Sequence, residues 1–180
     1  MLRSPLSPPN IRRAFLLAIA MLCLFGSKNN AVAASDNRTP VISRAAPDFS
    51  RMDLNHGQVN LAAYRGKVVL LNFWATWCSP CLIEMPHFVA WQQAYGQRGL
   101  QVIGVSMDDD AQPVRTAYQR YRLNYPVVMG DEKLGELYGG IFGLPVTFLI
   151  DRTGKIRFMH ETGARLNRIR SEMENLLSER

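Results

Sequence analysis

Cysteine is scarce in this sequence, which has three cysteines in 180 residues. Cys23 lies in an apolar stretch near the N-terminus, so the rest of the chain contains only Cys78 and Cys81. This shortage excludes the framework of several structural disulfides that holds many small secreted domains together. The one remaining Cys-x-x-Cys pair is left to alternate between dithiol and disulfide.

A basic stripe with interleaved aromatic residues is also missing. The formal net charge is +6, but four basic residues precede residue 34 in a stretch that contains no acid, namely Arg3, Arg12, Arg13 and Lys28. Subtracting these four charges leaves +2 for the rest of the chain. Nucleic-acid-binding domains concentrate positive charge on one face, so we expect no nucleic-acid partner.

Long apolar runs are missing as well. The run Ala14–Phe25 is shorter than the roughly 20 residues that span a bilayer. It follows Arg12-Arg13 and precedes Ala31-Val32-Ala33, a small-residue pattern typical of a cleavable export signal. We predict a signal peptide over residues 1–33, with an uncleaved N-terminal membrane anchor as the alternative. Both hypotheses place the folded domain in the periplasm.

The most informative stretch surrounds the two cysteines. Val68–Trp74 is apolar almost throughout, as is typical of a strand covered on both faces. The segment Ser79–Tyr95 has the composition and apolar spacing of a helix, and Pro80 falls in its first turn, where proline is tolerated. We therefore expect a buried strand to deliver Cys78 and Cys81 to the N-terminus of a helix.

That position has chemical consequences for the cysteines. A helix N-terminus stabilises an anion through its unpaired N–H groups, and the thiolate is the reactive form of cysteine. We expect Cys78 to be the exposed attacking sulfur, and Cys81, one turn away, to be the resolving sulfur of a redox-active disulfide. Half of a zinc site and a purely structural disulfide remain the alternatives, although zinc takes four ligands.

The remaining pattern predicts one α/β domain. We expect a linker over residues 34–46 and a domain over residues 47–180, with no internal repeat and no second domain. An N-terminal β-hairpin is predicted from Pro47–Leu54 and Gln58–Leu61. Further strands and helices alternate, which predicts a mixed central sheet with helices on both faces. The strands are 100–106, 125–129, one beginning at Pro145, and 155–160; the helices are 112–122, 131–139 and 165–177.

Asp108, Asp109 and Asp110 form an acidic trio before the predicted helix at 112–122. Three carboxylates could bind a hard cation. Acids also cap and begin helices, and we favour this second interpretation. No metal site and no cofactor are predicted.

Trp77-Cys78-Ser79-Pro80-Cys81, followed by Pro86 and by Gly143-Leu144-Pro145, resembles the thioredoxin fold. The position of Glu84, the N-terminal hairpin and an extra strand–helix unit at 100–122 are similar to the exported TlpA/ResA branch, with its AhpC/TSA-redoxin-like domain. The resemblance covers about residues 45–178. It implies a thioredoxin-like thiol–disulfide oxidoreductase.

The resemblance also implies roles for individual residues. Pro145 should be a cis proline beside the disulfide, and the Leu144 backbone should hold an incoming peptide as an added strand. Trp77, Ser79 and Pro80 should contact the same peptide. Cytosolic thioredoxins carry a buried aspartate where this chain has Asn72. Glu84 is the candidate that takes over the role of this aspartate, as a buried carboxyl that moves the proton of Cys81. The alternative is that Glu84 is a surface residue in the first turns of the helix.

Three functions remain in competition. The first is a monomeric periplasmic reductant of exported proteins, for example apocytochrome c or copper-site assembly proteins, which receives electrons from a DsbD/CcdA-like membrane donor. The second is a disulfide-forming oxidant or peroxidase of the same fold. The third is a copper(I) metallochaperone, in which Cys78, Cys81 and a histidine hold the ion.

Overall fold

The computed structural model of the chain describes residues 43–161 and 166–179. The predicted signal peptide or anchor, and the linker as far as residue 42, lie outside these described residues. The elements run in the order β1 (Arg44–Ala45), β2 (Ser50–Met52), β3 (Gln58–Asn60), the 3-10 helix η1 (Leu61–Tyr64), β4 (Val68–Trp74), α2 (Ser79–Tyr95), the 3-10 helix η2 (Gly96–Arg98), β5 (Leu100–Ser106), α3 (Ala111–Arg120), β6 (Val127–Met129), α4 (Glu132–Leu137), β7 (Val146–Ile150), β8 (Lys155–His160) and α5 (Leu166–Ser178).

Six of these strands form one mixed sheet in the order β1-β8-β7-β4-β5-β6. Strands β4, β5 and β6 are parallel, whereas β7 runs antiparallel to β4, and β8 and β1 continue the antiparallel half. The predicted mixed sheet is confirmed. Because the parallel strands end at one edge, the loops that follow β4 and β5 meet there with the segment that precedes β7.

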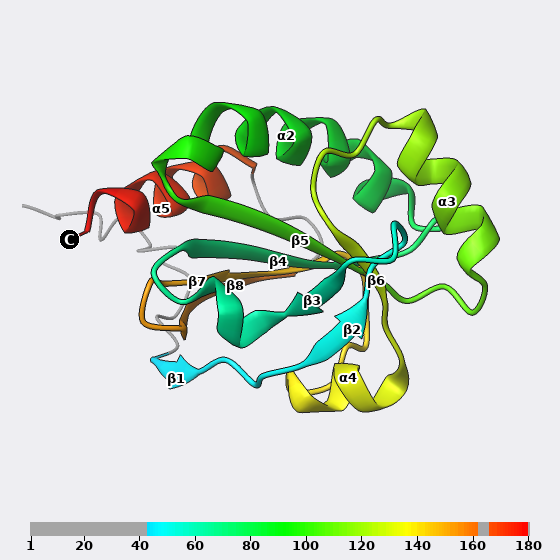
Figure 1. Cartoon of the computed structure of the whole chain (residues 1–180), viewed down its shortest axis with the longest axis horizontal. Coiled ribbons are helices and arrows are strands. Elements are labelled where there is room, and N and C mark those ends of the chain that lie inside the picture. Colours follow the sequence, from blue (N-terminus) through cyan, green and yellow to red (C-terminus); the bar gives the residue numbers. More distant parts are fainter. Residues whose placement is uncertain (1–42, 162–165, 180) are drawn as a thin grey trace, which may run out of the picture. The chain divides into compact units, whose positions relative to one another are not determined.

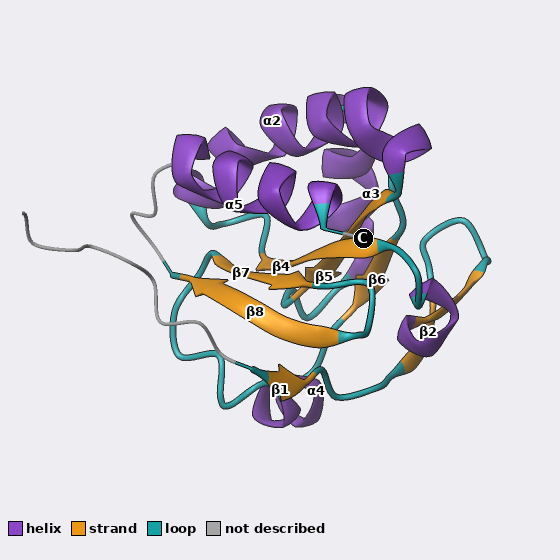
Figure 2. Cartoon of the chain, turned by 90° about the vertical axis from the view of Figure 1, so that its left-hand side faces the viewer, coloured by secondary structure: helices purple, strands orange, loops and turns teal. Residues whose placement is uncertain are grey.

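Helices cover both faces of the sheet, as predicted. Helices α2, α3 and α5 lie on one face, and α4 lies on the other together with η1 and the β2–β3 hairpin (Figures 1 and 2). Two buried cores result, one on each side of the sheet. Every residue of β4 is buried, which explains why this strand lacks the alternation of a half-exposed strand.

Helix α2 buries one stripe of side chains at helical spacing, which consists of Cys81, Glu84, Met85, Phe88, Trp91 and Tyr95. Apolar burial of such a stripe holds a helix to its sheet more strongly than intrinsic propensity does. Ile83 is apolar but 66% exposed, because it points away from that stripe. The helix continues through Pro86 and ends at Tyr95, before Gly99 adopts a left-handed conformation at φ 98°.

The N-terminal hairpin forms where it was predicted, with Ser50–Met52 paired to Gln58–Asn60. It is attached to the edge of the sheet by the Leu54 N–H, which donates to the Val127 carbonyl at 2.9 Å. The folded region begins earlier than the predicted linker boundary at residue 46. Arg44 and Ala45 pair with β8 as β1, a two-residue strand too short to leave a hydrophobic pattern.

The acidic trio divides into different roles. Asp110 is the N-cap of α3 and accepts the Gln112 N–H at 2.9 Å, as predicted. Asp108 does not cap the helix. It is 9% exposed and accepts hydrogen bonds from the Thr76 N–H, the Thr76 hydroxyl and the Ser106 hydroxyl. Asp108 therefore ties the loop that leads to Cys78 to the end of β5.

This geometry predicts unequal effects along the trio. Asp108→Ala removes the acceptor of three donors, and we expect it to lower the free energy of unfolding by about 3 kcal/mol. Loss of the cap in Asp110→Ala should cost about 1 kcal/mol. Urea denaturation measures both, with Asp109→Ala as the matched control, which should stay within about 0.5 kcal/mol of wild type. Equal losses in all three variants would contradict the assigned role of Asp108.

Candidate active site

Cys78 and Cys81 form a disulfide across the first turn of α2, with their Cα atoms 5.3 Å apart. Cys78 is the N-cap residue of the helix, and its sulfur accepts the Cys81 N–H at 3.3 Å. The loop before it is closed by the Cys78 N–H, which donates to the Ala75 carbonyl at 3.2 Å. The sulfur of Cys78 thus occupies the position where helix N–H groups stabilise negative charge.

The two cysteines are not equally accessible. Cys78 is 5% exposed and Cys81 is 1% exposed. Cys78 is the more accessible of the two, but it is largely buried and is not the openly exposed sulfur that the sequence predicts. Ser79 and Pro80, which follow it, are exposed, and Trp77, which precedes it, is 71% exposed.

Pro145 lies at the start of β7, and the Leu144–Pro145 peptide bond is cis, as the resemblance implies. Val146, the next residue, pairs with Phe73 near the end of β4. The Leu144-Pro145 segment therefore lies at the same edge of the sheet as the loop that carries Cys78. Pro145 is buried and Leu144 is half-buried.

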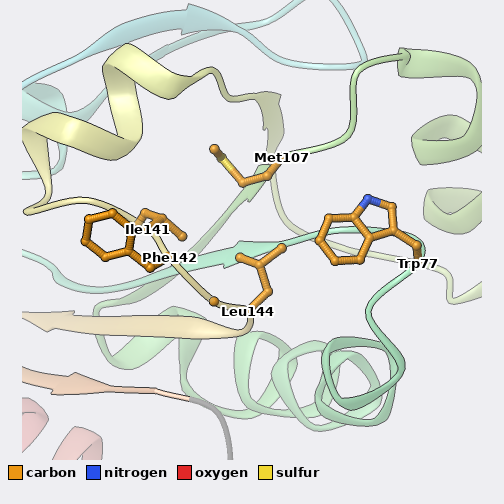
Figure 3. A pocket seen from close by; sticks show the side chains of 6 residues that line it. Trp77, Met107, Ile141, Phe142 and Leu144 are labelled. Atoms are coloured by element: carbon orange, nitrogen blue, oxygen red, sulfur yellow. The ribbon is translucent and has the colours of Figure 1, made fainter.

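An apolar groove with a volume of about 260 Å³ lies at this edge, lined by Trp77, Met107, Ile141, Phe142, Gly143 and Leu144. Figure 3 shows Leu144 between Trp77 on one side and Ile141 and Phe142 on the other. Phe142 is 98% exposed, so water covers nearly all of its ring. Exposed aromatic side chains beside a concave apolar surface are typical of a site that binds another molecule.

Glu84 is only 7% exposed, which contradicts the alternative of a surface glutamate. Its Oε2 atom has no hydrogen-bond partner among the described residues. Burial raises the pKa of this carboxyl to about 7, because removal from water disfavours the charged form. Glu84 stands one turn after Cys81 on the buried stripe of α2, so a group that titrates near neutral pH lies on the same face as the inner cysteine.

Asn72 lies on the buried strand β4 and donates its amide hydrogen to the Thr147 hydroxyl at 2.9 Å. This pair satisfies a buried polar position without an ionisable group. The structure brings no histidine to the cysteines as a third ligand: within residues 43–161 and 166–179, no three His, Cys, Asp or Glu side chains cluster closely enough to hold a metal ion.

Five residues of this edge were missed from the sequence. Thr76 and Asp108 position the cysteine loop, and Met107, Ile141 and Phe142 line the groove. The polar pair leaves no local pattern, because its members are separated by 32 positions along the chain. The sequence around Phe142 did indicate an exposed aromatic side chain. A large aromatic residue between Gly140 and Gly143 belongs to no predicted helix or strand that could bury it.

Comparisons with known proteins agree with this geometry. The AhpC/TSA family model matches residues 42–159. A thiol-disulfide oxidoreductase ResA of Geobacillus thermodenitrificans is 31% identical over 149 residues, which cover 81% of this chain and 86% of that protein. A protein of the same name from Bacillus thuringiensis subsp. konkukian is 37% identical over 117 residues, which cover 64% of this chain and 66% of that protein.

Among solved structures, a Chlorobium tepidum protein described as the thiol:disulfide interchange protein DsbE superposes with a TM-score of 0.71 at 30% identity, covering 78% of this chain and all 100% of its own. A superposition over this share of both chains shows that the α/β architecture is thioredoxin-like. The chain therefore belongs to the AhpC/TSA family and is a thioredoxin-like thiol–disulfide oxidoreductase of the TlpA/ResA type.

Proposed function

We propose that this protein reduces disulfides of exported proteins in the periplasm, with Cys78 and Cys81 as its redox pair. The observation that carries the proposal is the disulfide at the N-terminus of α2, with its more accessible sulfur next to an exposed apolar groove. A client polypeptide would lie in that groove beside Leu144. The clients that we propose are exported proteins such as apocytochrome c or copper-site assembly proteins.

The first step begins from the dithiol form. The Cys78 thiolate, stabilised by the N-terminus of α2 and by the Cys81 N–H, attacks one sulfur of the client disulfide. A mixed disulfide forms between Cys78 and the client, and the other client sulfur leaves as a thiolate. Trp77 and Leu144 flank the groove in which the polypeptide chain next to the client cysteine would be held.

The second step closes the ring. Glu84 accepts the proton of the Cys81 thiol, and the resulting thiolate attacks the Cys78 sulfur and releases the second client thiolate. The client gains two electrons and two protons overall, and the protein is left with the Cys78–Cys81 disulfide. A DsbD/CcdA-like membrane protein would return the two electrons. A carboxyl with a pKa of about 7 can both accept and release a proton at neutral pH.

Glu84 also supports the direction of electron flow. Once ionised, its carboxylate disfavours a second negative charge nearby, and thiolates exist only in the reduced form. Above neutral pH this repulsion destabilises the dithiol relative to the disulfide. The effect makes the protein a stronger reductant, in opposition to the helix N-terminus, which favours the thiolate.

Cys81→Ala should stop the reaction after the first step. The mixed disulfide then accumulates on Cys78, because no resolving sulfur remains, and mass spectrometry of the trapped complex from a periplasmic extract identifies the client. Cys78→Ala is the matched control and should trap at least tenfold less. Equal trapping by both variants, or no trapping by either, would contradict the assignment of Cys78 as the nucleophile.

Glu84→Gln should change both the stability and the kinetics above neutral pH. Since the folded pKa of about 7 exceeds the ordinary value of 4.5, wild type loses stability as the pH rises from 4.5 through 7. This loss is on the order of 3 kcal/mol. Glu84→Gln lacks a titrating group, so it should be more stable than wild type at pH 8 and nearly equal at pH 4.5.

Thermal denaturation of the disulfide form across this pH range measures the stability effect, with the exposed Glu136→Gln as the control that should follow wild type. The rate of the resolving step should also lose its inflection near pH 7 in Glu84→Gln. Identical pH profiles for wild type and Glu84→Gln in both measurements would remove Glu84 from the mechanism.

A further inference from the structure

The turns and loops at the two ends of the central sheet differ in their charge. The turns at the end where β4 and β5 begin contain five basic residues and one acid: Arg65, Lys67, Arg98, Arg152, Lys155 and Asp151. We call the turns 65–67, 96–99 and 151–155 the basic end. At the opposite edge, near Cys78, the loop after β5 contains Asp108, Asp109 and Asp110, and Asp131 and Glu132 lie at the start of α4. Arg51 pairs with Asp131 at 2.7 Å, so part of this negative charge is neutralised.

Hydrogen bonds join the three turns of the basic end, which faces the viewer in Figure 2. The Gly66 N–H donates to the Arg152 carbonyl at 2.8 Å, and the Arg152 guanidinium donates back to the Gly66 carbonyl at 2.7 Å. The same guanidinium donates to the Arg98 carbonyl at 3.4 Å and the Leu177 carbonyl at 3.2 Å. Arg152 thus fixes the turns against one another and against the end of α5.

Acids next to this surface neutralise only part of its charge. Arg157 is paired with Asp151 at 3.4 Å and with Glu179 at 2.8 Å, and Arg65 lies 3.6 Å from Asp48. Lys67 lies over the ring of Tyr64, at 5.9 Å from the ring centroid. Arg98 lies over the ring of Tyr95, at 5.1 Å from the ring centroid, and interacts electrostatically with Glu174. A ring contact leaves the positive charge in place, so exposed cations remain across the surface.

The two ends are far enough apart to act separately. Strand β4 connects them, and its seven residues extend over roughly 20 Å, or about two and a half Debye lengths at physiological ionic strength. An anionic surface would therefore attract one end of the domain and repel the other. Such a charge distribution sets the orientation of a domain as well as its affinity.

The chain enters the domain at the basic end. Ala45 of β1 pairs with Lys155, and the Ala46 N–H donates to the Gly154 carbonyl at 2.9 Å. The sequence that precedes this point includes the apolar run Ala14–Phe25. A retained membrane anchor, one of the two hypotheses for that segment, would be joined to the domain at this end.

We propose that the basic end docks on the surface of a lipid bilayer that contains anionic phospholipid, with the Cys78–Cys81 edge directed away from it. The partner is the phosphate of the headgroups, which exposed lysine and arginine side chains attract within a Debye length. This orientation leaves the apolar groove open to polypeptides in the aqueous compartment. The inference is independent of the client. The membrane donor of the proposed function would meet the Cys78–Cys81 edge while the domain is released from the bilayer, which a reversible electrostatic contact allows.

Sedimentation of the full chain with vesicles tests the proposal. The N-terminal segment contains Arg3, Arg12, Arg13 and Lys28, so it also favours vesicles with about one third phosphatidylglycerol over phosphatidylcholine vesicles. The contribution of the basic end is therefore measured by the loss of anionic binding when its lysines are replaced. We expect at least tenfold tighter binding to the anionic vesicles, lost at about 0.5 M salt. Lys67→Gln combined with Lys155→Gln should weaken this binding by on the order of 20-fold.

The matched control combines Arg120→Gln with Lys133→Gln, which removes the same charge from α3 and α4, and should change binding less than threefold. Hydrogen–deuterium exchange on the vesicles should protect residues 65–67 and 151–155 but not residues 107–110. Equal binding of both vesicle types, an equal effect of both double variants, or protection at residues 107–110 would each overturn the proposal. Binding of soluble polyglutamate as tight as that of the vesicles would also overturn it, in favour of an acidic protein partner.

Discussion

Strand β4 is buried on both faces along its whole length, and this packing determines where the two cysteines lie. The strand pairs with β5 on one side and with β7 on the other, so its carboxyl end is held at the centre of the sheet. Helix α2 packs back over the same strand, and its first turn therefore starts beside that end. The disulfide, the cis Leu144–Pro145 bond and the apolar groove meet there because each belongs to an element anchored to β4.

Two opposing electrostatic effects act on this pair of sulfurs. The N-terminus of α2 and the Cys81 N–H favour negative charge at Cys78. The buried carboxyl of Glu84, whose pKa is raised to about 7 by burial, disfavours additional negative charge once it ionises. The balance makes the stability of the dithiol depend on pH near neutrality. Asn72 on β4 is not ionisable and pairs with Thr147, so the buried acid of this site is Glu84 on α2.

Most of the fold could be predicted from the sequence because its signals are local. The apolar run Val68–Trp74, the helical spacing after Cys81 and the turn residues before Lys155 each define an element without reference to the others. Strand β1 was missed because two residues carry no periodicity, and their pairing with β8 depends on a partner more than 100 positions away.

Some residues of the candidate site could be predicted from the sequence and others could not. Cys78, Cys81 and Pro145 stand in recognisable motifs, and the structure brings them to one edge of the sheet. Whether Glu84 is buried could not be decided from its own helix, because the layer that covers it is tertiary. Asp108 looked like a helix cap from sequence, yet it binds Thr76 from another element. Pairings of this kind depend on which loops meet in space.

The reduction potential of the Cys78–Cys81 couple tests the central claim most directly. Equilibration in dithiothreitol and glutathione buffers, followed by alkylation and mass spectrometry, measures the fraction of each cysteine that is reduced. The account predicts a two-electron transition in which both cysteines change together, with a potential below about −200 mV at pH 7. A potential near −120 mV, or cysteines that never exchange with the buffer, would contradict a reductant built on this pair.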